Sequence, residues 1–500
     1  MTNMAINKVV LINLPDYGSC ADSFTPDYAI GSFSLYPPLG LLYVATAIKD
    51  DFPVEVMDVV ARKLKISQII EEIARKKPDV LGISCQTLRL YPMTAIINGV
   101  KSRLPGITIV IGGPHTSLYP VETLNLPGVD YVIVGDGEKP FKLLLEALSA
   151  GDPGMIKNTD GLVFRDTDGK PVLNRPNYQP IDGIKIPDRT LLNYDYYYTA
   201  ADAKEPVVSM ISSRGCPFNC IFCDVQEKTY RARSAGNVVD EMEYIAGLFK
   251  EPVIHIFDDN FNLRKDRVMA ICSETERRNL KVKWTTRARV MPFDEEMVLA
   301  MKNAGLKRIH LGVESGSETS LRLMKKGINK EQIRKAFALC HKYDVDTLAY
   351  FIIGYSWETK KDINDTLKFI QEIFPSYIMA NALYPVPKTE AYNTLLKTGK
   401  IKEDFWLKFV REPARNFRLP QYQNLKTKRY LKRKLDEIYL TFYLSPRFIL
   451  KNMKETKKQK GMNVLQLVFR LKLAFLIFRS YAASRILELL EFRGGSNEIK

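Results

Sequence analysis

The chain has 500 residues, of which 46% are hydrophobic and 26% charged, the composition of an ordinary soluble globular protein with about three domains. Seven cysteines in so long a chain do not form a disulfide framework, and the apolar runs fall short of the roughly 18 residues that a membrane-spanning helix requires. The net charge of +16 is concentrated at one end, because residues 401–500 hold 23 Lys and Arg against 9 Asp and Glu, a surplus of 14.

Residues 1–150 alternate short apolar runs with segments of helical periodicity. Apolar residues recur three and four positions apart in 38–51, 66–77 and 91–104, which predicts helices. Buried strands are predicted between them, at residues 8–14, 53–58, 79–84, 107–112 and 130–135. Parallel strands need such crossover connections. We therefore predict an α/β fold, with a doubly wound, flavodoxin-like (Rossmann-like) domain whose ligands lie beyond the carboxyl ends of its strands.

The rest of the chain divides into three further parts. Residues 151–205 are rich in Pro, Gly, Asp and Tyr and are interpreted as an ordered connector. Residues 206–400 repeat the strand–helix alternation, which predicts a partial (β/α)6 barrel of the TIM type with its active site at the carboxyl ends of the strands. Its strands are predicted at residues 206–213, 253–258, 281–286, 307–313, 345–354 and 376–385. Residues 401–500 are predicted to be helical and basic.

Three cysteines crowd into the segment SSRGCPFNCIFCDV, directly after the first barrel strand: Cys216, Cys220 and Cys223. Three thiolates in a short loop can bind a soft metal. Structural zinc sites use four ligands, usually as two C-x2-C halves, and the second half is missing here. A [4Fe–4S] cluster held by three cysteines leaves one iron open for a substrate. Zinc, or three buried thiols without a metal, are the alternatives.

This segment, with Phe222 before its last cysteine, resembles the radical S-adenosylmethionine (SAM) superfamily, and the barrel pattern agrees. The resemblance implies that the three cysteines hold a [4Fe–4S] cluster, that its open iron chelates SAM, and that reductive cleavage of SAM yields a 5′-deoxyadenosyl radical. The loops FDDNF (257–261), GVESGSE (312–318) and FIIGYSWET (351–359) fit the same family. The SAM-binding residues that it implies are Phe222, Asp258, Asp259, Asn260, Glu314, Ser315 and Gly354. By itself, GVESGSE also fits a helix N-cap at Ser315 or Ser317.

Glycine-rich loops of the N-terminal domain resemble the cobalamin (B12)-binding domain that is fused to one large radical SAM subclass. The resemblance rests on YPPLGLLYVATAI, GISCQT, IGGPHTS and VGDGEKP, whose glycines let the backbone approach a flat corrin ring or a nucleotide tail. The cobalamin-binding residues that it implies are Asn13, Thr87, Leu88, Arg89, Gly112, Gly113, His115, Gly135, Gly137 and Glu138. A different nucleotide, or a sheet kept for structure alone, are the alternatives; G-x-G-x-x-G is absent.

The chain departs from the family patterns at two places. It lacks the D-x-H-x-x-G that supplies an axial histidine in other cobalamin domains, so we expect base-off, His-off binding with Leu88 or Arg89 facing the lower side of cobalt. Alternatively, Arg89 is a solvated loop residue, and His115 either contacts the corrin or caps the following turn. PVPKTEAY (385–392) replaces the usual P-x-P-G-T-x-x-Y, and GYSWET replaces a glycine- and proline-rich turn, which leaves the substrate open.

The isolated cysteines and histidines are predicted to be structural. Single cysteines that are scattered along a chain are more often buried, inert thiols than ligands, and this applies to Cys20, Cys85, Cys272 and Cys340. His255 and His310 lie within predicted strands and are interpreted as core residues with satisfied hydrogen bonds, whereas His341 is placed on a helix surface.

The two resemblances together imply a cobalamin-dependent radical SAM enzyme with a [4Fe–4S] cluster, SAM and cobalamin as cofactors. We predict a C-methyltransferase that acts on an unactivated carbon through a 5′-deoxyadenosyl radical and methylcobalamin. The alternative is an oxidative cyclase or rearrangement enzyme without methyl transfer, such as the anaerobic cyclase of chlorophyll synthesis, and a more distant one is a non-enzymatic cobalamin sensor. Methylthiolation of tRNA or protein would need three further N-terminal cysteines, but only Cys20 and Cys85 precede the cluster segment.

The expected partners are a small-molecule, lipid or peptide substrate and a one-electron reductant of the flavodoxin or ferredoxin type. A cytoplasmic location is expected, because the N-terminus lacks the basic region and cleavage site of a secretory signal. The basic residues 425–490 are predicted either to cap the barrel with their charges in solvent, or to contact a membrane surface or a protein. Nucleic acid is not expected, because no recognised binding fold accompanies the charge.

Overall fold

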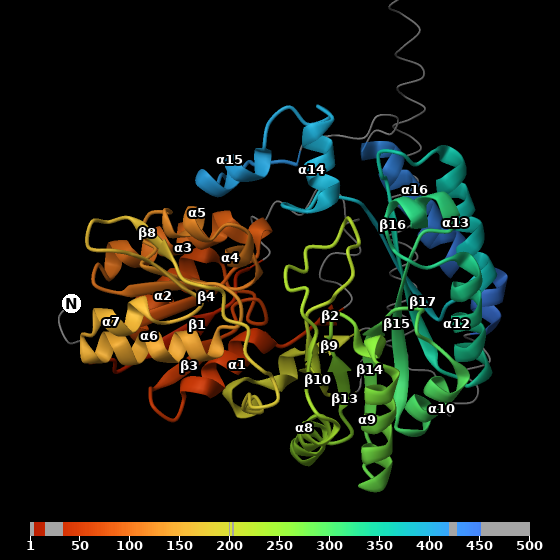
Figure 1. Cartoon of the computed structure of the whole chain (residues 1–500), viewed down its shortest axis with the longest axis horizontal. Coiled ribbons are helices and arrows are strands. Elements are labelled where there is room, and N and C mark those ends of the chain that lie inside the picture. Colours follow the sequence, from red (N-terminus) through yellow and green to blue (C-terminus); the bar gives the residue numbers. More distant parts are fainter. Residues whose placement is uncertain (1–4, 16–33, 200, 203–204, 420–427, 452–500) are drawn as a thin grey trace, which may run out of the picture. The chain divides into compact units, whose positions relative to one another are not determined.

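The structure, a computed structural model, describes residues 5–15, 34–199, 201–202, 205–419 and 428–451, and the chain forms two compact units (Figure 1). Unit 1 comprises residues 1–21, 36–197 and 396–419, and unit 2 comprises residues 22–35, 198–395 and 420–500. Most of the segment interpreted as a connector therefore groups with unit 1. The four-part division of the chain remains a proposal.

Unit 1 is built on a seven-stranded sheet with the order β3-β1-β4-β5-β6-β7-β8, in which the first five strands are parallel. The strands are β1 (Val9–Ile12), β3 (Val54–Met57), β4 (Val80–Ser84), β5 (Thr108–Gly112), β6 (Tyr131–Ile133), β7 (Leu162–Arg165) and β8 (Pro171–Leu173). Every residue of β1 is buried, because parallel strands are covered on both faces and so read as continuous apolar runs. The prediction of a doubly wound, flavodoxin-like sheet is confirmed.

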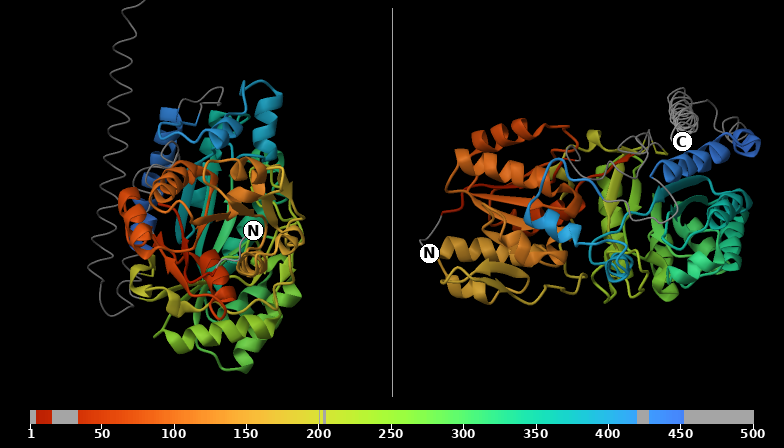
Figure 2. Two further views of the ribbon diagram at one scale, coloured as in Figure 1. Left: turned by 90° about the vertical axis from the view of Figure 1, so that its left-hand side faces the viewer. Right: turned by 90° about the horizontal axis from the view of Figure 1, so that it is seen from above.

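Helices cover both faces of this sheet, as the view from above in Figure 2 shows. The long ones are α1 (Leu39–Ile48), α2 (Ile66–Lys76), α3 (Leu90–Arg103) and α6 (Glu138–Ala150), and they pack as the pairs α1–α6 and α2–α3. In α2, Ile69 and Ile73 are fully buried one turn apart while charged residues occupy the other side, the pattern of an amphipathic helix. The short helices are α4 (Pro114–Leu118), α5 (Pro120–Leu124), α7 (Pro153–Lys157) and α15 (Phe405–Arg411).

The antiparallel strands β7 and β8 are a feature that the sequence analysis does not predict. They pair with each other, and β7 also pairs with β6, within the segment interpreted as a connector. These strands have only four and three residues, too few for a clear alternation. The turn between the two strands is the feature from which the sequence could have predicted this hairpin. The carboxylate of Asp166 accepts hydrogen bonds from the amides of Asp168 and Lys170 at 2.9 and 2.8 Å, as Asp commonly does in turns.

Unit 2 is built on six parallel strands in the order β10-β13-β14-β15-β16-β17. They are β10 (Val207–Met210), β13 (Val253–Ile256), β14 (Lys283–Ala288), β15 (Leu306–Glu314), β16 (Asp346–Ile353) and β17 (Tyr377–Ala382). The helices between them are α8 (Ala235–Leu248), α9 (Lys265–Arg277), α10 (Glu295–Asn303), α11 (Glu318–Leu323), α12 (Lys330–Lys342) and α13 (Lys360–Ile373), which lie outside the curved sheet in Figure 1. The prediction of a partial (β/α)6 barrel is confirmed.

Two parts of the basic region 401–500 are described: residues 401–419, which group with unit 1, and residues 428–451, which begin with a helix that packs on the barrel. Helix α16 (Lys428–Tyr443) contacts β17 and α13. Its buried hydrophobic residues are Leu431, Leu435, Ile438, Tyr439 and Phe442, and Asp436 is buried as well. The hydroxyl of Tyr439 lies 2.9 and 3.1 Å from the amide and carbonyl of Ala380, and that of Tyr443 lies 3.2 and 3.3 Å from those of Ile378. Residues 452–490 of the predicted contact surface lie outside the described residues. No helix in the described ranges is long and apolar enough to cross a membrane.

Candidate cofactor and active site

The three clustered cysteines lie in a loop that follows β10 and the short strand β11 (Ser213–Arg214). Backbone hydrogen bonds fix its path: the Cys216 amide donates to the Glu227 carbonyl at 3.0 Å and the Ile221 amide donates to the Met324 carbonyl at 3.1 Å. Gly215 has a φ of +82°, and a Cβ there would lie 2.2 Å from the Thr229 carbonyl oxygen. Only glycine fits such a close approach at positive φ, so the entry into the loop is determined by its sequence.

The thiols of Cys216, Cys220 and Cys223 are free and partly exposed, which fits a cofactor ligand better than a core packing role. Burial raises the pKa of Cys216, and it raises that of Cys223 to about 11, so a metal would have to displace protons from these groups. Among the described residues, no three His, Cys, Asp or Glu side chains converge closely enough for a single metal ion. Thiolates on three corners of a cubane lie farther apart than thiolates about 2.3 Å from one zinc ion. Three thiols in one short loop at a barrel strand end are the ligand set of a [4Fe–4S] cluster held by three cysteines.

An arginine that the sequence analysis does not identify lies against this loop. The guanidinium of Arg289 is 3.6 Å from the Cys220 sulfur and stacks on the Phe218 ring at 3.9 Å from its centroid. It also donates to the backbone carbonyl of Lys326. Arg289 therefore presents a hydrogen-bond donor to one of the three clustered thiols. Arg289 follows the carboxyl end of β14. Because functional residues of such barrels lie at the carboxyl ends of strands, this position could have identified Arg289 from the sequence.

The loop after β13 gives its three predicted SAM-binding residues different surroundings. Asp258 is fully buried and accepts from the amides and hydroxyls of Ser212 and Ser213 at 2.5–3.0 Å, so its carboxylate supports the start of the cluster loop. Asp259 is exposed and accepts from the Gly215 amide at 3.1 Å. Although it reaches solvent, partial burial raises its pKa, and the Gly215 hydrogen bond acts in the opposite direction.

Asn260 is the residue of this loop that best fits a bound ligand. It is 1% exposed, and both polar atoms of its side-chain amide lack a hydrogen-bond partner within the described part of the chain. An unpaired buried amide is costly, so a polar ligand group at this position is chemically reasonable. This observation supports SAM, whose amino, carboxylate and ribose groups need such partners.

The loop after β15 holds a buried ion pair. Oε1 of Glu314 accepts from Nζ of Lys326 at 2.6 Å, and both side chains are buried. Glu314 has a φ of +66°, and the pairing of β15 with β16 shifts its register between Gly312 and Glu314. A strained backbone of this kind persists where the surroundings fix it, commonly at functional sites. A Cβ on Gly312 would lie 2.5 and 2.6 Å from the two paired atoms, so glycine leaves room for the pair.

The serines of the same loop play structural roles in the described contacts. Ser317 is the N-cap of α11, accepting from the Ser320 amide at 3.3 Å, which confirms the N-cap alternative for this residue. The Ser315 hydroxyl lies 3.2 Å from that of Thr366 on α13. A ribose contact of Ser315 therefore remains a prediction.

Phe222 and Gly354, which are far apart in the sequence, are brought to one place. The Phe222 ring contacts Tyr355 edge-on, with centroids 6.4 Å apart, and Tyr355 stacks on Trp357 at 4.6 Å. Gly354 has a φ of +97°. Its amide donates to the carboxylate of Glu358 at 2.6 Å. Glu358, which sequence reasoning missed, therefore closes the turn that follows β16.

In unit 1, His115 is buried rather than exposed at the strand ends. Its Nδ1 lies 3.0 Å from the hydroxyl of Thr87, and its backbone amide donates to the Cys85 carbonyl at 3.1 Å. Burial lowers the pKa of His115 to about 3, so the ring is neutral at physiological pH. Its Nε2 lacks a partner among the residues described. The contact between Thr87 and His115 joins the loops that follow β4 and β5, so the structure brings these two predicted cobalamin residues together.

The glycines of the two glycine-rich loops differ in what they accommodate. Gly113 has a φ of +96°, and a Cβ there would lie 2.8 Å from the Cys85 carbonyl oxygen; at Gly135 (φ +86°), it would lie 2.4 Å from the Asn177 carbonyl oxygen. Both glycines thus serve close backbone approaches within the protein. A Cβ on Gly112 would have no atom within 4 Å, so Gly112 offers open space at the end of β5. Gly137 precedes α6, and Glu138 lies in its first turn.

The remaining predicted cobalamin residues lie near other strand ends. Asn13, after β1, donates to Asp58 at 2.7 Å and accepts from the Val59 amide at 2.9 Å, so it joins the ends of β1 and β3. Leu88 and Arg89 belong to a 3-10 turn, Thr87–Arg89, and are half-buried. A cavity of about 800 Å³ lies near the ends of β1 and β3, lined by Pro15, Val59, Leu64, Tyr91, Arg415 and neighbours, which do not include the predicted cobalamin residues.

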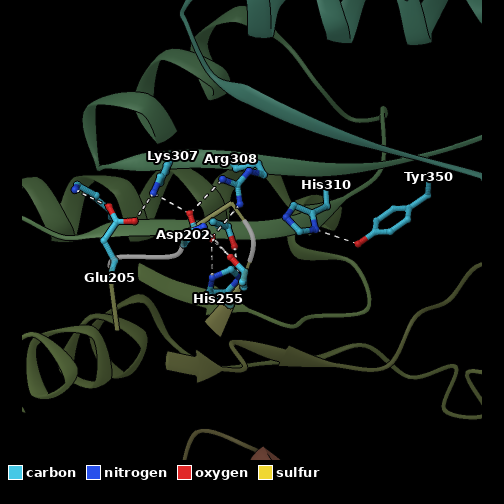
Figure 3. Close-up of polar contacts among 10 residues, drawn as sticks. Asp202, Glu205, His255, Lys307, Arg308, His310 and Tyr350 are labelled. Carbon is cyan, nitrogen blue, oxygen red and sulfur yellow. Dashed lines mark hydrogen bonds and ion pairs between the residues drawn. The ribbon is translucent and has the colours of Figure 1, made fainter. Parts of the chain in front are cut away.

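A buried polar cluster inside the barrel of unit 2 was not predicted (Figure 3). Asp202 is fully buried and accepts from both Nη atoms of Arg308 at 3.1 and 3.2 Å and from the Thr199 hydroxyl at 2.7 Å. Lys307 Nζ lies 2.8 Å, and His255 Nε2 3.4 Å, from the same carboxylate. Although burial opposes ionisation, the hydrogen bonds and the cationic neighbours hold the pKa of Asp202 well below its usual range. The cluster includes the third residue of β13 and of β15, and residues toward the N-terminal ends of barrel strands commonly serve stability.

The isolated cysteines and histidines are placed mostly as expected. Cys85, Cys272 and Cys340 are buried, and Cys20 lies outside the described residues. His255 and His310 are buried in strands, and His341 is exposed on α12. The expectation that His310 is satisfied is wrong for one of its nitrogens, because its Nε2 has no partner in the described ranges.

Comparison with known proteins gives the class that these two units define. The family model of the radical SAM superfamily matches residues 210–370, and that of the B12 binding domain matches residues 29–145. The first match covers most of the six-stranded barrel with the cysteine loop, and the second covers the flavodoxin-like part of unit 1 from α1 to α6 but not β1.

Individual relatives agree with this class. An uncharacterised methyltransferase of Pyrococcus horikoshii is 31% identical over 427 residues, which are 84% of this chain and 90% of that protein. The chain therefore belongs to the family of radical SAM enzymes with a B12-binding domain. The anaerobic magnesium-protoporphyrin IX monomethyl ester cyclase of Rubrivivax gelatinosus is 28% identical over 74% of this chain and 69% of that enzyme. The fold also resembles that of a solved structure, the radical SAM methyltransferase TsrM of Kitasatospora setae with cobalamin and a [4Fe–4S] cluster bound. The match has a TM-score of 0.62 at 19% identity and covers 79% of this chain and 76% of the TsrM chain.

Proposed function

We propose that the protein is a cobalamin-dependent radical SAM C-methyltransferase that acts on an unactivated carbon. The observation that carries the proposal is the loop of three free, partly exposed cysteines at the carboxyl end of a barrel strand, in a chain that also contains a B12 binding domain. The relative from Pyrococcus horikoshii is named as a methyltransferase. When bound, the cluster and SAM supply an organic radical, and cobalamin supplies the methyl group.

Residues of unit 2 would hold and orient SAM beside the cluster loop. The ligands are Cys216, Cys220 and Cys223. The unpartnered amide of Asn260 and the exposed carboxylate of Asp259 are placed to bind polar groups of SAM. The buried carboxylate of Glu314, already oriented by Lys326, is a third candidate. Phe222 packs with Tyr355 near this loop, where it would help to exclude water from a reactive radical.

Residues of unit 1 would hold cobalamin at the ends of β4, β5 and β6. The open space at Gly112 allows a flat ring to approach the backbone. We propose base-off, His-off binding, because the chain lacks the D-x-H-x-x-G that supplies an axial histidine. Leu88 or Arg89 is then the candidate for the lower side of cobalt. The electron donor would be a flavodoxin- or ferredoxin-type reductant, and the substrate a small molecule, lipid or peptide.

One alternative function is favoured by a specific finding. The similarity to the cyclase of Rubrivivax gelatinosus extends over 74% of this chain, so an oxidative cyclisation or a rearrangement with the same cofactors is the second candidate. A methyltransferase and a cyclase differ in the fate of the SAM methyl group, and this difference can be measured without knowing the substrate.

The test uses the full chain, reconstituted anaerobically with iron, sulfide and cobalamin, and incubated with SAM and a one-electron reductant. A methyltransferase releases S-adenosylhomocysteine as well as 5′-deoxyadenosine. Release of 5′-deoxyadenosine alone would favour the cyclase, and release of neither would favour a sensor. Cys220→Ala should abolish 5′-deoxyadenosine formation, whereas Cys272→Ala, which alters a buried cysteine of α9, is the matched control.

A further inference from the structure

The interior of the barrel in unit 2 carries an arginine whose side chain reaches solvent. Arg287 lies in β14, a strand with neighbours on both sides. It is exposed, although Thr286 and Ala288 on either side of it are buried. Successive side chains of a strand point to opposite faces of the sheet, so Arg287 lies on the face opposite to these two neighbours.

Contacts with two other strands show that this face is the concave one. The central guanidinium carbon of Arg287 lies 4.5 Å from the ring centroid of Phe257, which follows β13. Its charge also acts on the hydroxyl of Tyr350 in β16, where burial raises the pKa of the phenol and Arg287 opposes that rise. Since β13 and β16 lie on opposite sides of β14, a side chain of β14 reaches both only across the inner face of a curved sheet. Arg287 therefore projects into the barrel.

Tyr350 is held in place by a histidine of the strand between. Its hydroxyl lies 3.0 Å from Nδ1 of His310 in β15, as Figure 3 shows. Burial, with the nearby charge of Arg308, holds the pKa of His310 well below its usual value, so the imidazole is neutral. A neutral imidazole offers one donor and one acceptor, and the phenol is thereby kept at a defined position beside Arg287.

Other arginines of the barrel are engaged by the protein, whereas Arg287 forms no ion pair within the part of the chain that the structure describes. Arg308 is paired with Asp202. Arg289 donates to the Lys326 carbonyl and stacks on Phe218. Within the described ranges, Arg287 has no carboxylate within salt-bridge distance: it stacks on the Phe257 ring, lies near the Tyr350 hydroxyl, and interacts with the Asp259 carboxylate only at longer range. An exposed guanidinium that stacks on an aromatic ring is charged and accessible, and its planar fork can bind an oxyanion with two parallel hydrogen bonds.

We propose that Arg287 is a substrate-specificity residue, which binds a carboxylate or phosphate group of the substrate inside the barrel, with Tyr350 and His310 as positioning residues. The proposal rests on the proposed function, since it names a chemical feature of the substrate of that enzyme. It narrows the substrate to a molecule with an oxyanion. An ion pair between this oxyanion and Arg287 would fix the position of the substrate, and therefore of its reacting carbon, inside the barrel.

The carboxylate of SAM is a second possible source of such an oxyanion, and the structure favours the substrate. Arg289 and Lys326 are the cations beside the cluster loop, because they contact Phe218, Phe222 and Cys220. Arg287 lies in β14 and precedes Arg289, which follows the carboxyl end of that strand, by two positions; in extended backbone this places Arg287 about 7 Å deeper in the barrel. SAM bound at the cluster would therefore meet Arg289 and Lys326 first.

The test is a footprint of arginine reactivity on the reconstituted full chain. Phenylglyoxal modification of Arg287 is followed by mass spectrometry, without anion and with benzoate, inorganic phosphate or SAM as the probe. Arg287 should react readily without anion, whereas the buried Arg308 should react slowly. Benzoate or phosphate should slow the modification of Arg287 by about tenfold at roughly ten times the dissociation constant, because protection follows 1 + [L]/Kd. Arg264, an exposed arginine paired with Asp266, is the internal control and should keep its rate.

Two variants test the positioning role. Tyr350→Phe should leave Arg287 reactive but weaken its protection by benzoate several-fold, whereas Tyr343→Phe, at an exposed tyrosine beside Glu295, should not. Protection by SAM alone, the lack of protection by every probe, or an unreactive Arg287 would each overturn the proposal. The footprint needs no turnover, so its outcome is separate from that of the methyltransferase proposal, which depends on S-adenosylhomocysteine release.

Discussion

Replacing Asp202 by Asn should destabilise the barrel of unit 2 far more than an ordinary surface change. The substitution keeps the shape of the side chain but removes the negative charge that faces Arg308 and Lys307. Asp202 is fully buried and Arg308 is 2% exposed, so the guanidinium would lose its counter-ion in a place that water does not reach. Removing one partner of a buried ion pair typically costs about 3–5 kcal/mol.

Hydrogen exchange of β15, followed by mass spectrometry on the intact protein, measures this cost locally. A loss of about 3–5 kcal/mol in opening free energy corresponds to exchange that is faster by roughly two to three and a half orders of magnitude. Glu205→Gln is the matched control, because Glu205 pairs with Lys283 and Lys307 at a partly exposed position, where about 0–1 kcal/mol is expected. If both variants accelerate exchange equally, Asp202 does not hold the barrel as we infer.

The same variant has a pH dependence with a defined sign. The pKa of Asp202 is depressed in the folded protein, so its contribution to stability is fully present above the ordinary value of about 3.9. The contribution is lost as the pH falls below that value toward the folded-state pKa. The difference in stability between the natural protein and Asp202→Asn should therefore be constant near neutral pH and should shrink below about pH 4. A difference that grows on acidification would contradict this reasoning.

Three further predictions concern the cofactors and the C-terminal region. Reconstituted protein should hold about four irons and four sulfides, and SAM cleavage should be abolished by each of three substitutions, Cys216→Ala, Cys220→Ala and Cys223→Ala; cleavage by any of them would remove that cysteine from the ligand set. Gly112→Val should weaken cobalamin binding in a well-folded protein, whereas Gly113→Val should also lower the melting temperature, because its Cβ meets the Cys85 backbone. By paramagnetic resonance, bound cobalamin should show no histidine nitrogen on cobalt. If residues 452–490 contact anionic surfaces, the full chain should sediment with anionic vesicles at low salt and not at high salt. A variant in which Lys454, Lys457, Lys458 and Lys460, all outside the described residues, are changed to Gln should not sediment. Equal, negligible sedimentation of both proteins would favour a solvated cap.

The parts of the fold that could be predicted from the sequence are those that depend on local pattern. Parallel strands of three to nine residues can be recognised from their apolar residues because both faces of the sheet are covered. Even β15 is recognised, although it contains Lys307 and Arg308. The cysteine ligands are adjacent in the chain, so their grouping requires no knowledge of tertiary structure. In contrast, β7 and β8 are too short to give a periodic signal.

Residues that depend on long-range pairing could not be predicted. Asp202 lies 106 positions before Arg308, and nothing in its surroundings, TAADAKEP, marks it as buried. Arg287 reads as a polar residue in a strand, and its exposed position inside the barrel follows only from the curvature of the sheet. Likewise, Gly113 was predicted to make room for cobalamin, but the close approach of Cys85 shows that the protein itself needs this glycine.

The two tyrosines of α16 have a consequence for how the chain can be shortened. Strand β17 is the last of its sheet, and an unpaired edge strand is a template for pairing with another molecule. Tyr439 and Tyr443, one helical turn apart, occupy the amides and carbonyls of Ala380 and Ile378, which are the groups that a further strand would use. The two phenol groups thus cap the free edge of the sheet and oppose edge-to-edge aggregation. A truncated protein for crystallisation should end after residue 451, because removal of α16 would free this edge and favour self-association.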